Sequence, residues 1–159
     1  MLATTRHFTA TGFVVHEGSI ALHWHPKVKA WLPPGGHIEP NEDPVQAVLR
    51  EIEEETGLKA EVVSTKPAID LKYPSQVTAP FTIMVEDIHD PVDGFHQHID
   101  MIYFCRLKGA SEPLNDGWRW VSKGHLTDSL PLGNGHSEPV APPDDVRLLA
   151  GYAFDAVAG

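Results

Sequence analysis

The stretch that decides the fold is GHIEPNEDPVQAVLREIEEETGL, residues 36–58. Its apolar residues recur at spacings of three and four, which is the pattern of a helix with one packed face. These residues are Val45, Val48, Leu49 and Ile52. At about 100° per residue, Glu51, Glu54 and Glu55 fall within a neighbouring arc of about 100°. One edge of the predicted helix therefore packs, and the other gathers three carboxylates.

Signals at both ends bound this helix. Asp43 can accept hydrogen bonds from the free amides of the first turn, and Pro44 is well tolerated at the first helical position. Gln46 completes a capping box. Gly57 can adopt the left-handed conformation that ends helices. The sequence predicts a helix from Pro44 to about Thr56.

The three carboxylates lie near the helix C-terminus, where they repel one another and face the negative end of the helix dipole. Arg50 can pair with Glu54, but one guanidinium cannot neutralise three charges. Hard divalent cations can, since Mg²⁺ and Mn²⁺ prefer oxygen ligands. Glu53 points to the far side of the apolar stripe and is expected to be a solvated charge.

The loop before the helix decides between a metal site and a solvated acidic face, which is what a bare EIEEE run usually is. Pro33-Pro34 ends a short extended piece at Trp31-Leu32 and is followed by Gly35-Gly36. Glycines let the backbone approach a ligand closely, so a carbonyl can join the carboxylates. The combination favours a metal site.

Residues 36–58 resemble the signature of the Nudix hydrolase family at every fixed position. From Gly36, five residues precede Glu42, and seven more precede Arg50-Glu51-Ile52. Glu54-Glu55 and Gly57-Leu58 each follow after one spacer. The resemblance covers residues 33–58 and implies an α+β fold, an α/β/α sandwich around a mixed sheet. We expect a single domain over residues 1–159.

The resemblance also implies roles for individual residues. Glu51, Glu54 and Glu55 correspond to divalent metal ligands, and Gly35 to a carbonyl donor. Arg50 corresponds to the residue that orients a glutamate. Glu42 and Gly36 correspond to supporting residues. The general base stays open between Glu54 and Glu55, with Glu112 and Asp116 as distant candidates.

The implied reaction is Mg²⁺-dependent hydrolysis of a phosphoanhydride bond in a nucleoside-diphosphate-linked substrate, with Mn²⁺ able to substitute for Mg²⁺. A second hypothesis is a nucleotide-sensing domain that keeps the fold without turnover. Base, sugar and phosphate number stay open, because specificity in this family resides in loops outside the signature.

The rest of the chain predicts a sheet and two helical segments. Strand-like runs span 8–16, 20–25, 81–88, 99–107 and 118–121, with further strand-like pieces within 59–72. The first two runs read as a hairpin. A helical turn is expected at 126–130, and Asp144 or Asp145 is expected to cap a final helix that ends near Ala156.

Composition restricts the partners. The 159 residues carry a formal charge of −10, which repels duplex nucleic acid, and about 42% of them are apolar. Cys105 is the only cysteine, so no internal disulfide is expected. Residues 1–20 lack a basic start with an apolar core, and no run approaches the roughly 18 apolar residues of a membrane span. We expect a cytoplasmic protein acting on a small nucleotide, and leave its oligomeric state, a homodimer included, open.

Ten histidines include two pairs on strand-like runs, His23 with His25 and His96 with His98. Each pair can lie on a wet sheet face or bind zinc, and His96 and His98 can also line a substrate groove; a zinc protein is the third hypothesis. Trp31 and Tyr73 can stack on a base. With His96 and His98, they are the candidate substrate-binding residues.

Overall fold

The computed structural model describes residues 3–158. Its elements, in chain order, are β1 (Arg6–His16), β2 (Ser19–His25), β3 (Ala30–Leu32), β4 (Gly35–His37), α1 (Pro44–Thr56), β5 (Ala60–Val62), β6 (Thr82–Asp90), β7 (Gly94–Leu107), β8 (Trp118–Ser122), α2 (Lys123–Thr127) and α3 (Asp144–Ala158). The eight strands form one sheet in the order β3-β2-β1-β7-β5, with β4 on β1, β6 on β7 and β8 on β2.

The sheet is mixed, as predicted. Strands β1 and β7 run parallel over ten paired residues, from Arg6 opposite Gln97 to Val15 opposite Arg106. The other pairings are antiparallel, including the predicted hairpin of β1 and β2. The strand-like run 99–107 lies in β7, which pairs with β1, β5 and β6.

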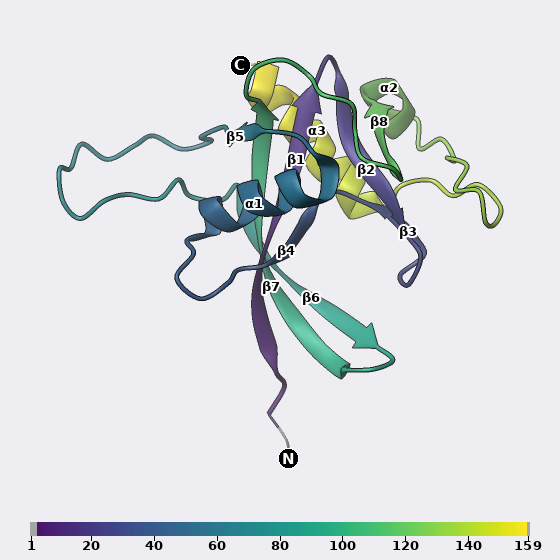
Figure 1. Ribbon diagram of the computed structural model, residues 1–159, viewed down its shortest axis with the longest axis horizontal. Coiled ribbons are helices and arrows are strands. Elements are labelled where there is room, and N and C mark those ends of the chain that lie inside the picture. Colours follow the sequence, from purple (N-terminus) through teal and green to yellow (C-terminus); the bar gives the residue numbers. More distant parts are fainter. Residues whose placement is uncertain (1–2, 159) are drawn as a thin grey trace.

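Helices cover the two faces of the sheet, with α1 in front and α3 behind (Figure 1). The alternation of β1 fills both layers, because successive side chains of a strand point to opposite faces. Phe13 and Val15 join the cluster under α3, whereas Ala10 and Val14 join the cluster under α1. The predicted α/β/α sandwich is confirmed.

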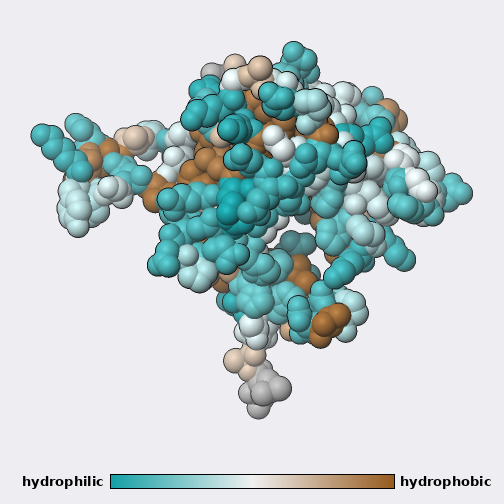
Figure 2. All heavy atoms as spheres, in the orientation of Figure 1, coloured by the Kyte–Doolittle hydropathy of each residue, from teal (hydrophilic) through white to brown (hydrophobic). Residues whose placement is uncertain are grey.

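The outer surface over α1 is mainly hydrophilic, and apolar atoms appear at the tip of the β6–β7 hairpin (Figure 2). At that tip, Val92 is 85% exposed. The hairpin and the N-terminal end of β1 project from the body of the molecule (Figure 1). Among residues 3–158, no helix combines the length and apolar character that a membrane crossing needs.

Several predicted boundaries need correction. Of residues 59–72, only Ala60–Val62 form a strand, and residues 63–81 form a projecting loop (Figure 1). Its three prolines have no amide to donate to a sheet ladder. Strand β7 begins at Gly94, five residues early. Helix α2 spans Lys123–Thr127 rather than 126–130, because the Ser122 hydroxyl caps the His125 amide at 3.2 Å. Asp144 and Asp145 lie in the first turn of α3.

Candidate active site

Helix α1 has the predicted ends. The Asp43 carboxylate accepts from the Gln46 amide at 2.8 Å, and the Gln46 side chain accepts from the Asp43 amide at 2.9 Å. Gly57 is left-handed with φ of 79°. On β1, a Cβ at Gly12 would lie 2.7 Å from Cδ1 of Ile52. Because Gly12 has no side chain, α1 can pack closely against the sheet at this position.

Arg50 is the centre of the polar network on α1. Its Nε and Nη2 donate to both oxygens of Glu42 at 2.7 and 2.9 Å. Its Nη1 donates to Glu51 at 3.0 Å and to Glu54 at 3.2 Å, and Nη2 also reaches the carbonyl of His37 at 3.1 Å. One guanidinium thus orients three carboxylates and ties α1 to β4.

Glu42 is held as an anion by this network. The Arg50 guanidinium, together with the Glu39 amide at 2.9 Å, lowers the pKa of Glu42 to about 2. The same hydrogen bonds raise the pKa of Arg50 above its ordinary value. Glu42 therefore fixes the position of the Arg50 guanidinium.

The glycine pair lies directly against the carboxylates. A Cβ at Gly36 would lie 2.4 Å from Oε1 of Glu51, so only glycine leaves room for that carboxylate in its present position. The Gly35 amide donates to Oε1 of Glu55 at 3.0 Å. The backbone of β4 and the last turns of α1 therefore form one site.

Glu55 differs electrostatically from its neighbours. Burial raises its pKa to about 7, the charges of Glu51 and Glu54 add to the rise, and the Gly35 hydrogen bond opposes it. Glu54 is far more open to solvent, with 61% of its side chain exposed. Glu53 is exposed, in agreement with its predicted position on the far side of the helix.

The donor set fits a hard divalent cation. Among residues 3–158, Glu51 and Glu54 share Arg50 as their ion-pair partner, Arg50 is already engaged by Glu42, and the charges of Glu51 and Glu54 both act on Glu55. One guanidinium cannot balance this set of carboxylates, which favours a cation with oxygen ligands, and Mg²⁺ is one that carboxylates and phosphates commonly share.

A cleft of about 390 Å³ lies on the α3 face, next to this site. Leu32 and Pro33, which lead into β4, line the cleft together with Thr11, the β1 partner of Gly35. The rest of the lining consists of Phe13, Met84, Val85, Glu86, Asp87, Asp100, Ile102, Asp145, Val146 and Leu149. The lining of the cleft is thus apolar with an acidic component.

Asp100 is a lining residue that sequence reasoning missed. Thr9 donates to it at 2.9 Å, and Thr11 donates to its two oxygens at 3.0 and 2.8 Å. Burial nevertheless raises its pKa, and burial with Asp100 and Asp145 nearby also raises the pKa of Glu86. The long-range pairing of β1 with β7 creates this arrangement, and no local motif signals it.

Asn115 was also missed. Its side-chain amide donates to the carbonyl of Glu55 at 3.0 Å, and its backbone amide donates to the carbonyl of Thr56. These bonds hold the loop before β8 against the C-terminal end of α1. Glu112 and Asp116, the distant base candidates, are exposed in the same loop.

The predicted substrate-binding residues do not form one group. Trp31 is only 3% exposed and packs in the core, with Cζ of Arg119 lying 5.5 Å from its ring centroid. This burial contradicts the prediction that Trp31 stacks on a base, since β3 turns the ring inward. Tyr73 is 84% exposed in the loop 63–81, and its role stays a prediction. His96 and His98 lie beyond the cleft, among other histidines.

Comparisons with known proteins agree with this geometry. Residues 5–142 match the model of the NUDIX domain family. The crystal structure of a NUDIX family hydrolase from Clostridium perfringens is 29% identical and superposes with a TM-score of 0.76, covering 96% of this chain and 99% of that one.

Two curated proteins are similar over shorter stretches. An RNA pyrophosphohydrolase from Zymomonas mobilis is 30% identical over 65% of this chain and 69% of its own length. An asymmetrical bis(5'-nucleosyl)-tetraphosphatase from Sus scrofa is 40% identical over 33% of this chain and 31% of its own length.

Proposed function

The chain belongs to the Nudix family and is a Nudix-type hydrolase, and from this premise we propose that it uses Mg²⁺ to hydrolyse a phosphoanhydride bond in a nucleoside-diphosphate-linked substrate. The observation that carries the proposal is that Glu51 and Glu55 lie against the glycine pair while Glu54 shares Arg50 with Glu51, so that one arginine serves several carboxylates. We propose that residues 1–159 act as one domain.

The three glutamates and the Gly35 carbonyl hold the cations, with Mn²⁺ able to replace Mg²⁺. When bound, the metal lowers the pKa of a water molecule and neutralises charge on phosphoryl oxygens. Arg50 is a positioning residue, because it donates hydrogen bonds to Glu51 and Glu54 while Glu42 holds its guanidinium in place.

Of the two glutamates left open as the general base, Glu55 is the better supported. The Gly35 amide holds its Oε1, which leaves Oε2 to accept the proton of the attacking water. In the metal-free protein, burial raises the pKa of Glu55 to about 7, in the direction that suits a carboxylate acting as a base. Glu54 is more exposed and already accepts from Arg50.

The cleft beside Gly35 is proposed to hold the nucleoside. Its apolar lining suits a planar base, whereas Asp100 and Glu86 would repel phosphates. The phosphates are therefore directed to the cations on the other side of Gly35. The names of the similar proteins support this substrate class, since both refer to cleavage within polyphosphates of nucleotides or RNA.

The test compares Glu54→Gln and Glu55→Gln with a matched control, Glu53→Gln, on the same helix. With Mg²⁺ and a substrate identified from nucleoside triphosphates, dinucleoside polyphosphates, nucleotide sugars and capped RNA, we expect kcat to fall by about 10²-fold or more in the first two. The control should retain wild-type kcat, because Glu53 faces solvent. Full activity in Glu55→Gln would refute the assigned base, and binding without turnover across the panel would refute hydrolysis.

A further inference from the structure

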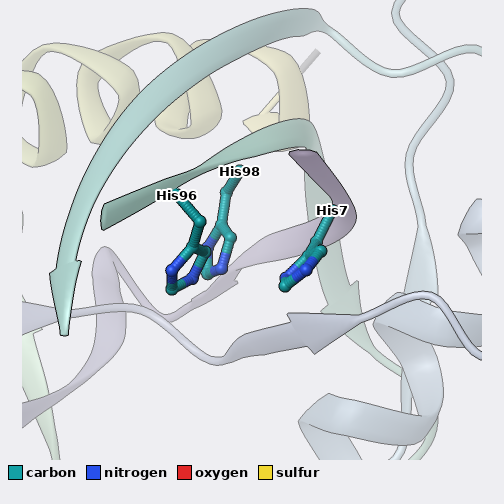
Figure 3. Close-up of side chains that lie close together, drawn as sticks. All are labelled: His7, His96 and His98. Atoms are coloured by element: carbon teal, nitrogen blue, oxygen red, sulfur yellow. The ribbon is translucent and has the colours of Figure 1, made fainter. Parts of the chain in front are cut away.

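Four histidines from three strands gather at the projecting end of the sheet: His7 of β1, His37 of β4, and His96 and His98 of β7. The sheet register brings them together, because His7 lies opposite His98 and Thr9 lies opposite His37. Residues two apart in a strand share a face, which adds His96 to the group. Figure 3 shows the rings of His7, His96 and His98 directed toward the same space.

The ring nitrogens are near enough to share an ion. One nitrogen from each of His7, His96 and His98 lies within 4.8 Å of the others. The centroids of the His7 and His96 rings are 5.0 Å apart, and those of His96 and His98 are 5.1 Å apart. His37 stands beside this trio, with its Nε2 3.3 Å from Nδ1 of His7.

We propose that His7, His96 and His98 bind a transition-metal ion, with Zn²⁺ as the natural choice, and that His37 positions His7 from outside the coordination shell. Zinc–nitrogen bonds of about 2.0–2.1 Å in a tetrahedral site separate the nitrogens by about 3.4 Å. Each imidazole therefore moves inward by about 1 Å or less. Rotation about the side-chain torsions supplies this movement without shifting the strands.

Hydrogen bonds prepare two of the ligands. Nδ1 of His96 lies 3.2 Å from the carbonyl oxygen of Gly94, which can only accept, so Nδ1 carries the proton and Nε2 keeps its lone pair. If Nδ1 of His7 donates to His37 in the same way, Nε2 of His7 is also free. Such outer partners are typical of histidines that bind metals.

His98 carries an unmet polar atom. Its Nε2 is buried and has no hydrogen-bond partner within residues 3–158. Buried polar atoms in folded proteins are nearly always satisfied, and an unsatisfied one calls for an explanation such as an ion. A metal bound to this nitrogen would satisfy it.

The ion class differs from that of the carboxylate site. Imidazole suits Zn²⁺, Cu²⁺ and Ni²⁺, whereas Mg²⁺ prefers oxygen ligands. A shallow hollow of about 540 Å³, lined by His7, Phe8, His37, Ile38 and Glu39, lies beside the trio and has room for water at the fourth position. The ion would connect the projecting ends of β1 and β7 through His7 on one strand and His96 and His98 on the other.

The chain contains its own control. His23 and His25 of β2 also sit two apart, with ring centroids 5.7 Å from each other. The His23 ring, however, stacks on Trp118 at 4.3 Å. In the part of the chain that the structure describes, this pair gains no third ligand of the required geometry.

The experiment uses the full chain without a polyhistidine tag, stripped of metal and then equilibrated with Zn²⁺ in excess Mg²⁺, which occupies the carboxylates. Bound zinc is measured by elemental analysis after dialysis, and affinity is measured by competition with a chromophoric chelator. We expect one zinc per chain, at least tenfold weaker binding in His96→Gln and His98→Gln, and about 10- to 100-fold weaker binding in His37→Gln. His23→Gln and His25→Gln should bind as the wild type does.

The absence of bound zinc would overturn the proposal, as would equal losses in the control variants. Circular dichroism of the metal-free variants checks that each is folded. If His96→Gln, which changes the most buried of the three positions, fails this check, His7→Gln and His98→Gln, which change partly exposed positions, carry the test. Co²⁺ in place of Zn²⁺ should give visible absorption bands in the wild type that both variants lose, and bands that persist in them would refute the assignment.

Discussion

Replacing Gly36 by alanine tests whether the position of one carboxylate controls the proposed reaction. The new Cβ would lie 2.4 Å from Oε1 and 2.5 Å from Cδ of Glu51. Ordinary contacts of this kind begin at 3.4 Å, so the carboxylate must move by about 1.0 Å. The Glu51 side chain can do this, because it is the flexible end of a helical residue.

The displacement should cost activity far more than stability. A misplacement of about 1 Å near the reacting atoms costs about 10²-fold in rate, or about 2.7 kcal/mol of barrier. The fold loses at most the contact of Arg50 with Glu51, a partly exposed ion pair worth about 1 kcal/mol or less. For a chain of this size, that corresponds to a fall in Tm of no more than about 4 °C.

The assay measures kcat with saturating Mg²⁺ and Tm by calorimetry, with Gly124→Ala as the control because a Cβ there meets nothing within 4 Å. Gly35→Ala provides the opposite case. Its Cβ would lie 2.7 Å from the backbone oxygen of Ala10, so stability should fall together with activity. Gly36→Ala with kcat within threefold of wild type, at unchanged Tm, would refute the reasoning.

Four further predictions follow from individual residues. The folded pKa of Glu42 is lowered to about 2, so ionised Glu42 stabilises the fold above its ordinary pKa, and this effect is lost as the pH falls. The difference in urea midpoint between wild type and Glu42→Gln should therefore shrink from about pH 5 to about pH 2. The folded pKa of Glu55 is raised to about 7, so its ionisation costs stability as the pH rises through 7. In EDTA, the free energy of unfolding of Glu55→Gln should equal that of wild type at pH 4 and exceed it at pH 8 by about 1 kcal/mol, a figure reduced for solvent screening. Met84→Trp should fill part of the cleft and raise KM about tenfold with kcat within about twofold in steady-state kinetics. Cys105 is fully buried, which raises its pKa to about 12, so it should react with a disulfide reagent at pH 8 only after denaturation.

The helix that carries the acidic residues could be predicted to the residue, because its signals are local. Asp43, Pro44 and Gln46 determine its start, and Gly57 determines its end. The side-chain periodicity also placed Glu51, Glu54 and Glu55 on one edge and Glu53 on another. Local capping chemistry and a fixed angular repeat need no knowledge of the rest of the chain.

Features that depend on strand register could not be predicted in the same way. His7 and His98 are ninety-one residues apart, and only the parallel pairing of β1 with β7 makes them neighbours. The bonds from Thr9 and Thr11 to Asp100 arise from the same pairing. The burial of Trp31 could not be predicted either, because the sequence contains no signal for which face of the short strand β3 is buried.

Arg50 combines both kinds of feature, because it lies on the predictable helix α1 and also contacts the strand β4. Its guanidinium donates to Glu42, Glu51, Glu54 and the His37 carbonyl, so its donors are largely committed before any phosphate arrives. A residue so occupied is poorly placed to act as the main cationic partner of a polyphosphate in a chain of net charge −10. Cations held by the glutamates must therefore supply most of the attraction, and arginine serves to keep those glutamates in place. The ordering of the carboxylates by Arg50 and the need for metal ions are two consequences of the same shortage of positive charge.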